Sequence, residues 1–215
     1  DKPEWKLDAW SDLYIYFYLY GLSLLNEGGV FSFITSNSWL DVGYGKDLQR
    51  FLLTRGKLRL VVDNWARRSF ASADINTVIV LLKAPRDAKR QQSISLQHTA
   101  RFVMLTVPFE QVLSPVIWEE VDEASSRSTR PEYRVFPVKQ ADLLDRATDP
   151  EKEVFTGDKW GGKYLRAPDI YWVILEKARG KLVQLGDVAE VRRGFTTGAN
   201  KFFYLDDETI AQWGI

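Results

Sequence analysis

Two apolar segments joined by a short connection constrain the fold of this chain most. The segments are residues 58–63 and residues 76–82, and both have the short, β-branched pattern of buried strands. The connection, residues 64–75, leaves no room for the crossover helix that a parallel pair of strands needs. We therefore predict that these two strands run antiparallel to each other.

The segment before them predicts alternating helices and strands. Ser11 or Asp12 is placed to cap a helix that runs to Leu25 and ends at Gly28 and Gly29. Residues 30–34 then read as a buried strand, residues 35–38 as a polar turn and residues 44–53 as a second helix. This order predicts an α/β fold, with a parallel sheet and crossover helices that ends in the antiparallel hairpin.

The rest of the chain changes in character. We expect a strand at 101–107, a Ser/Arg-rich surface linker at 125–130, a helix at 168–178, and strands at 183–193 and 201–205. The predicted organisation is an α/β domain at 1–115, a connector at 116–180 and the start of a β-rich domain at 181–215.

Composition excludes several functional classes. Of the 215 residues, 29 are Lys or Arg and 29 are Asp or Glu, so a uniformly basic nucleic-acid-binding protein is excluded. There is no cysteine and only one histidine, which excludes thiol nucleophiles, Cys-type zinc sites and any site that needs two imidazoles. We expect no metal site. The most apolar run, residues 13–25, is shorter than the roughly 20 residues of a membrane-spanning helix, and we expect a cytoplasmic protein.

Three groups of segments resemble one family in order and spacing. They are residues 12–29, 33–40, 44–45 and 48–53; then Val61-Val62-Asp63, Phe70 and Asn76-Thr77-Val78-Ile79; and finally residues 185–187 and 191–203. Together they resemble gamma-class adenine-N6-specific DNA methyltransferases, most closely those of type IIG restriction–modification enzymes. The first two groups resemble the region after the catalytic motif, and the third resembles the start of the target-recognition domain.

The resemblance implies the C-terminal half of a Rossmann-like methyltransferase sheet. It also implies S-adenosylmethionine as methyl donor and double-stranded DNA as partner. The family binds the donor with a glycine-containing loop and holds the target adenine with an Asn-Pro-Pro-Tyr-type tetrapeptide, and neither occurs in this sequence. Because both lie upstream in the family, we expect this piece alone to be inactive and to contain no catalytic residue.

The resemblance places Phe70 where the family has an aromatic residue that stacks on the flipped target base. A phenylalanine buried at a strand end would have the same sequence pattern. Ser36 and Asn37 follow a predicted parallel strand, where ligands bind in open α/β sheets, although a turn or helix cap is an equal alternative. Asp63 ends the next strand and could orient Arg67 or Arg68.

Two clusters are candidates for DNA binding. Arg67 and Arg68 offer positive charge for phosphates, although a solvated arginine pair is the commoner explanation of such a run. The second cluster combines small, hydroxyl-bearing, amide and basic residues around a glycine loop, and an ordinary hairpin loop is its alternative: Arg192, Arg193, Thr196, Thr197, Gly198, Asn200 and Lys201.

Two further functions compete with a methyltransferase fragment. One is a non-catalytic DNA-binding specificity module, for which residues 194–201 would be the main evidence. The other is an α/β enzyme that acts on a small molecule unrelated to DNA.

Overall fold

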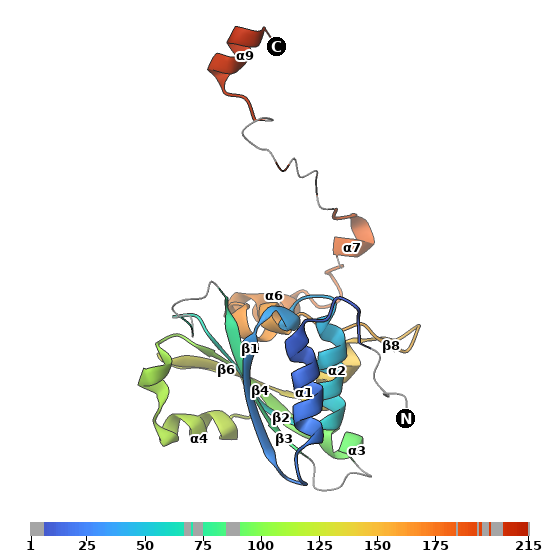
Figure 1. Ribbon diagram of the computed structural model, residues 1–215, viewed down its shortest axis with the longest axis vertical. Coiled ribbons are helices and arrows are strands. Elements are labelled where there is room, and N and C mark those ends of the chain that lie inside the picture. The colour runs from blue at the N-terminus through green and yellow to red at the C-terminus, as the bar shows by residue number, and fades with distance from the viewer. Residues whose placement is uncertain are drawn as a thin grey trace. The chain divides into compact units, whose positions relative to one another are not determined.

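The computed structural model describes residues 7–66, 70, 75–84, 91–183, 185–192, 194, 198 and 204–214 (Figure 1). The chain divides into two compact units, Asp1–Pro168 and Asp169–Ile215. Each unit is described by itself.

The first unit is built on a six-stranded sheet with the order β1-β3-β2-β4-β6-β5. Its strands are β1 (Val30–Ser36), β2 (Lys57–Asn64), β3 (Thr77–Lys83), β4 (Thr99–Leu105), β5 (Ser128–Thr129) and β6 (Tyr133–Lys139). Only β2 and β4 pair in parallel, and every other neighbouring pair is antiparallel. The fold is therefore a mixed α/β fold, as the sequence predicts.

The predicted hairpin is confirmed, since β2 and β3 pair antiparallel from Leu58 opposite Leu82 to Asp63 opposite Val78. The structure adds that β3 lies between β1 and β2 and pairs with both. The strands β1 and β2 run in the same direction, as expected, but they are not neighbours. β3 has apolar side chains at every position from Val78 to Leu82, a pattern typical of a strand with sheet on both sides and cover on both faces.

Residues 30–34 form a strand, as expected, but the expectation that this strand is buried is wrong. In the described residues β1 is an edge strand, and Val30 and Ile34 are 54% and 38% exposed. The reason is that only one face of β1 is covered. Phe31, Phe33 and Thr35 point to that face, where Tyr18 of helix α1 (Leu13–Ser23) packs on both rings and hydrogen-bonds Thr35.

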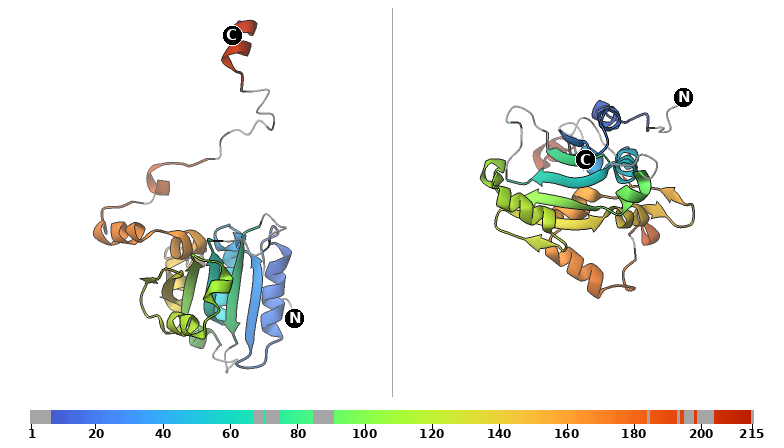
Figure 2. Two further views of the ribbon diagram at one scale, coloured as in Figure 1. Left: turned by 90° about the vertical axis from the view of Figure 1, so that its left-hand side faces the viewer. Right: turned by 90° about the horizontal axis from the view of Figure 1, so that it is seen from below.

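One face of the sheet carries most of the helices. As predicted, Asp12 caps α1, its carboxylate accepting the backbone N–H of Leu13. Helices α1 and α2 (Gly45–Arg55) lie side by side against the sheet (Figures 1 and 2). The short helices α3 (Gln91–Leu96) and α5 (Gln140–Arg146) pack against α2, and the π-helix η4 (Gly161–Arg166) packs against β4 and β6.

A chain of aromatic rings runs under these helices. Tyr18 contacts Trp39, Trp39 contacts Trp160, and Trp160 contacts Phe102 of β4, all edge to face. Phe102 then stacks on Tyr164 of η4. Because Trp39 and Trp160 are fully buried, this chain of rings ties the segment around residue 160 to the centre of the sheet.

The opposite face is covered by helix α4 (Pro115–Glu123) and the 3₁₀-helix η3 (Phe109–Val112). Val112 and Val121 pack there on Val62, Val103 and Val135. The acidic residues of 119–123 therefore lie on a helix whose Val121 is buried.

The compact unit continues past residue 115, where we expected a connector to begin. The Ser/Arg stretch contributes the edge strand β5, and β6 pairs with β4 along its whole length. The remaining strands of this unit, β7 (Thr148–Asp149) and β8 (Val154–Phe155), form a separate small hairpin. The sheet continues because β6 alternates inward and outward side chains against β4, a pattern that our prediction overlooked.

The second unit has helices α6 (Asp169–Lys177), α7 (Leu185–Val188) and α9 (Asp207–Trp213) among its described residues. The helix expected at 168–178 is confirmed. The strand expected at 183–193 is wrong at Leu185–Val188, where the backbone forms a helical turn. These residues are exposed and have no partner strand among the described residues, so local hydrogen bonds decide their conformation. The strand expected at 201–205 falls mostly outside the described residues.

No helix in the described ranges has the length and apolar character needed to cross a membrane.

Candidate functional site

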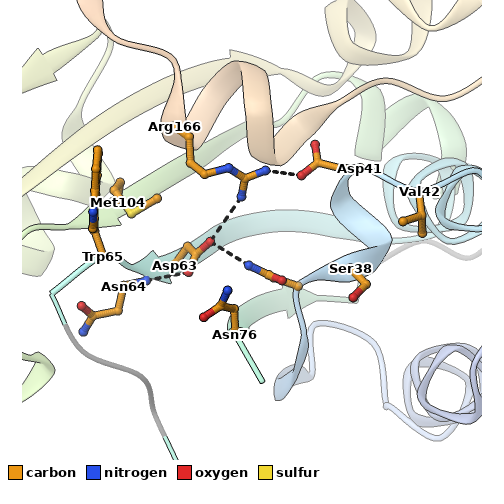
Figure 3. A pocket seen from close by; sticks show the side chains of 10 residues that line it. Ser38, Asp41, Val42, Asp63, Asn64, Trp65, Asn76, Met104 and Arg166 are labelled. Atoms are coloured by element: carbon orange, nitrogen blue, oxygen red, sulfur yellow. Dashed lines mark hydrogen bonds and ion pairs between the residues drawn. The ribbon is translucent and has the colours of Figure 1, made fainter. Parts of the chain in front are cut away.

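A cavity of about 460 Å³ opens where β1 and β2 end (Figure 3). Its lining is rich in carboxamide and carboxylate side chains: Asn37, Ser38, Asp41, Val42, Asp63, Asn64, Trp65, Asn76, Met104 and Arg166.

The position of the cavity follows from the direction of the strands. Because β1 and β2 run the same way, the residues after Ser36 and the residues that end β2 meet at one edge of the sheet. The backbone N–H of Asn37 donates to the carbonyl oxygen of Asn76 at 3.0 Å, which ties the end of β1 to the start of β3. Ligands bind at this edge in open α/β sheets.

Asp63 is a buried carboxyl group in the lining of the cavity. Its Oδ2 accepts the side-chain amide of Asn37 at 3.2 Å, and its Oδ1 accepts the backbone N–H of Asn64 at 2.8 Å. Burial raises the pKa of the Asp63 carboxyl, and the hydrogen bond from Asn37 is the largest opposing effect.

Arg166 joins Asp63 to a second carboxylate, as the dashed lines in Figure 3 show. Its guanidinium forms an ion pair with Asp41, which follows β1, and lies 3.8 Å from Oδ2 of Asp63. Asp41 also accepts the backbone N–H of Gly162 at 2.9 Å. A side chain at Gly161 would meet both Asp41 and the Arg166 guanidinium, and these two side chains would have to shift to make room for it.

Buried Gln49 of α2 holds the segment that carries Arg166. Its side-chain oxygen accepts the N–H of Asp158 at 2.9 Å, and its amide donates to the carbonyl of the same residue at 2.9 Å. The amide also donates to the carbonyl of Leu40 at 3.2 Å. A single side chain thus fixes the segment before η4 against the segment after β1.

The structure brings some of the predicted residues of the α/β unit to the cavity and leaves others outside its lining. Asn37 is one of the residues that line the cavity. Ser36 lies next to it and pairs its hydroxyl with that of Ser38 at 2.9 Å, and Ser38 rather than Ser36 reaches the lining. Phe70 is 47% exposed and is not among the lining residues. Asp63 pairs with Asn37 and Arg166, whereas Arg67 and Arg68 fall outside the described residues.

Most of the second predicted DNA-binding cluster also falls outside the described residues, namely Arg193, Thr196, Thr197, Asn200 and Lys201. Arg192 is exposed and forms an ion pair with Glu190 at 2.7 Å. Gly198 has a φ of +68°, a left-handed conformation that favours glycine.

The lining residues that the sequence analysis did not assign to the site include Asp41, Trp65, Asn76 and Arg166. Trp65 and Asn76 bound the connection between β2 and β3, so their position at a strand end was a usable signal. Arg166 lies far along the chain and no pattern in the sequence connects it to Asp41.

The cavity suits a flat, polar heterocycle. It combines amide donors and acceptors from asparagines with the indole ring of Trp65 and the apolar floor of Met104. It does not fit S-adenosylmethionine. No glycine is among its described lining residues, and its two carboxylates, which would otherwise accept ribose hydroxyls, are paired with Arg166.

Comparison with known proteins gives one family and several structures. Residues 4–70 match the model of the Eco57I restriction-modification methylase family. The type IIG restriction endonuclease BpuSI has a TM-score of 0.49 and 16% identity, over 93% of this chain and 22% of its own. The M protein of the type I restriction enzyme EcoKI has a TM-score of 0.43 and 16% identity, over 94% of this chain and 46% of its own.

A modification subunit of a putative type I restriction enzyme from Vibrio vulnificus YJ016 has a TM-score of 0.39 and 14% identity. That match covers 61% of this chain and 27% of the subunit. The chain thus spans between about a fifth and a half of the length of these three proteins.

Proposed function

From the similarity of residues 4–70 to restriction-modification methylases, we propose that this chain is part of a DNA methyltransferase of a restriction–modification system. Its substrate is adenine in double-stranded DNA, which is methylated at N6 with S-adenosylmethionine as donor. In this proposal the enzyme is gamma-class and type IIG, and it acts in the cytoplasm.

The observation that carries the proposal is the cavity at the ends of β1 and β2, most of whose lining residues lie in the matched segment 4–70. A base in a duplex must leave the helix before its edge can be methylated. Asparagine side chains line the cavity, and a carboxamide pairs well with the edge of adenine. The bond from Asn37 to Asp63 uses the NH2 group of Asn37 and does not involve its side-chain oxygen.

The methyl donor and the catalytic tetrapeptide belong elsewhere in the proposed enzyme. The cavity does not fit the donor, and the sequence contains no Asn-Pro-Pro-Tyr-type tetrapeptide. We therefore assign this chain the binding of the target base and part of the DNA, with Arg67, Arg68, Arg192 and the 193–201 segment as the DNA contacts. In this proposal residues 181–215 begin the target-recognition domain.

The test is methyl transfer by the full-length protein that carries this chain. Incubation with duplex DNA and isotope-labelled S-adenosylmethionine, followed by mass spectrometry of the nucleosides, should yield N6-methyladenine. A methylated cytosine would refute the adenine assignment. Salt-sensitive duplex binding with no methyl transfer would instead favour the DNA-binding specificity module.

Phe70→Ala tests the proposed stacking residue in the same assay. Loss of one base–aromatic stack should lower the methylation rate about 5- to 150-fold and change duplex affinity by less than about threefold. Phe109→Ala is the matched control, because Phe109 is a similarly exposed phenylalanine that packs on Trp118 away from the cavity. Equal rates for Phe70→Ala and the control would contradict the stacking role.

A further inference from the structure

Trp65 is an exposed tryptophan at the rim of the cavity. It is 69% exposed, whereas Trp39 and Trp160 of the same unit are fully buried. Its backbone N–H donates to the carbonyl of Leu105 at 2.9 Å, so the residue extends β2 alongside β4. The backbone of Trp65 is therefore held at the end of β2, while its indole ring stays exposed to solvent.

Arg134 of β6 supports the ring. Its guanidinium lies 5.9 Å from the centroid of the indole and donates to the carbonyl oxygens of Leu165 at 2.8 Å and Ala167 at 3.4 Å. Because both carbonyls lie at the end of η4, the cation is held in place independently of Trp65. A fixed cation near an aromatic ring limits the positions of that ring.

Polar groups in the cavity complement the ring. Asn37 and Asn76 present carboxamides to the same cavity, and Figure 3 shows the Asn76 side chain directed toward Asp63. The Asn37 amide is committed to Asp63, which leaves its oxygen to accept an amino group. A carboxamide matches the donor and acceptor pattern of an adenine edge, and an indole matches its flat face.

We propose that Trp65 is a stacking face for a purine base in this cavity, with Asn37 and Asn76 contacting the edge of the base. In the methyltransferase proposed above, on which this assignment of the ligand rests, the purine is the extruded adenine. Trp65 lines the cavity and Phe70 does not, so this assignment gives the stack on a base inside the cavity to Trp65, and Phe70 is the competing candidate for that role.

The test uses the 215-residue chain, labelled with ¹⁵N and titrated with deoxyadenosine. The chain has eight tryptophans, so the indole N–H signals are few, and Trp65→Phe identifies one by its disappearance. We expect a saturable shift of the Trp65 signal. Trp10 and Trp213 serve as internal controls, since they are 87% and 59% exposed and do not line the cavity. Equal shifts at the controls would mean nonspecific stacking and would overturn the proposal.

Affinity measured from the side-chain amide signals of Asn37 and Asn76 gives the second readout. We expect Trp65→Ala to weaken deoxyadenosine binding at least tenfold, and Trp65→Phe to stay within about threefold because it keeps an aromatic face. Trp10→Ala should leave the affinity unchanged. An unchanged affinity in Trp65→Ala would overturn the proposal.

A deoxyadenosine-containing single-stranded oligonucleotide separates the two sources of the purine. Tighter, salt-sensitive binding than that of the free nucleoside supports a base of DNA, and equal binding supports a free nucleotide. Methylation by the full-length protein with an unmoved Trp65 signal would refute this inference alone. A responsive Trp65 in a protein that methylates no DNA would refute the proposed function alone.

Discussion

At the scale of single residues, the cavity contains one buried carboxyl group, Asp63, whose pKa is raised by burial. Asp63 is removed from water, which favours its neutral form, while Asn37 and Arg166 favour its charged form. Its raised pKa means that the folded chain binds a proton at this site more readily than the unfolded chain does. Stability from this residue is therefore fully present below the ordinary pKa of aspartate and falls as pH rises through the pKa of the folded state.

Replacing Asp63 with asparagine removes this dependence on pH. Asp63→Asn keeps an oxygen that can accept the Asn37 amide, and Arg166 retains Asp41. The new NH2 group cannot accept the backbone N–H of Asn64, and we expect the removal of a buried charge to outweigh that lost bond. We expect its thermal midpoint at pH 7 to exceed that of the unmodified chain by about 2–4 °C. The gain should disappear below about pH 4, where Asp63 is protonated in both states. Scanning calorimetry from pH 3 to 8 checks this, and a midpoint at pH 7 below that of the unmodified chain would show that the charge stabilises the fold.

At the scale of elements, one glutamine on α2 positions the segment that leads into η4. Gln49 is 1% exposed and bonds both the N–H and the carbonyl of Asp158. The aromatic contacts of Trp160 and Tyr164 supply the area that η4 buries, but they do not fix its register along the chain. Hydrogen bonds are directional, so Gln49 determines where Arg166 meets Asp41.

Gln49→Leu should remove the partner of two partly buried backbone groups of Asp158 and of the buried carbonyl oxygen of Leu40. We expect a loss of about 2–4 kcal/mol of unfolding free energy, since each buried unpaired group costs about 1–3 kcal/mol. Urea unfolding followed by circular dichroism measures it. The control is Gln97→Leu, which makes the same change at an exposed site and should stay within about 0.5 kcal/mol of the unmodified chain. Equal effects of the two substitutions would contradict the role of Gln49.

At the scale of the whole molecule, burial is concentrated in the first unit. The core residues of the described chain, from Ile15 to Leu165, all precede Asp169. Helices α6, α7 and α9 have no buried residue. The hydrophobic stabilisation of the fold therefore comes from the unit that ends at Pro168.

Removing residues 169–215 should accordingly leave the thermal midpoint within about 2 °C of that of the whole chain. A chain that ends at Gly157 is the control. It lacks Trp160 and Tyr164 and should lose more than about 10 °C or fail to fold, because two buried aromatic residues are removed. Differential scanning calorimetry of the whole chain, the chain without residues 169–215 and the chain that ends at Gly157 measures the three thermal midpoints. A large drop on removal of 169–215 alone would show that the second unit contributes to the stability of the first.

Local patterns predicted the elements of the first unit well. The capped helix after Asp12, the strands around residues 60 and 80 and their antiparallel pairing follow from apolar spacing and from the length of one connection. The same patterns misplaced β1 in the interior, because an apolar run does not reveal whether one face or two will be covered. They also missed β6 as part of the main sheet, because the strand predicted at 101–107 does not reveal which later segment pairs with it.

For the cavity, the sequence by itself placed Asn37 and Asp63 at strand ends, where chain direction brings them together. Only the tertiary structure decided that Arg166 completes the site and that Trp65 lines it, while Phe70 does not. The physical reason is that strands and caps are determined by neighbours in the chain. The pairing of Arg166 with Asp41 instead depends on how η4 packs on the sheet, and contacts between distant residues leave no local pattern in the sequence.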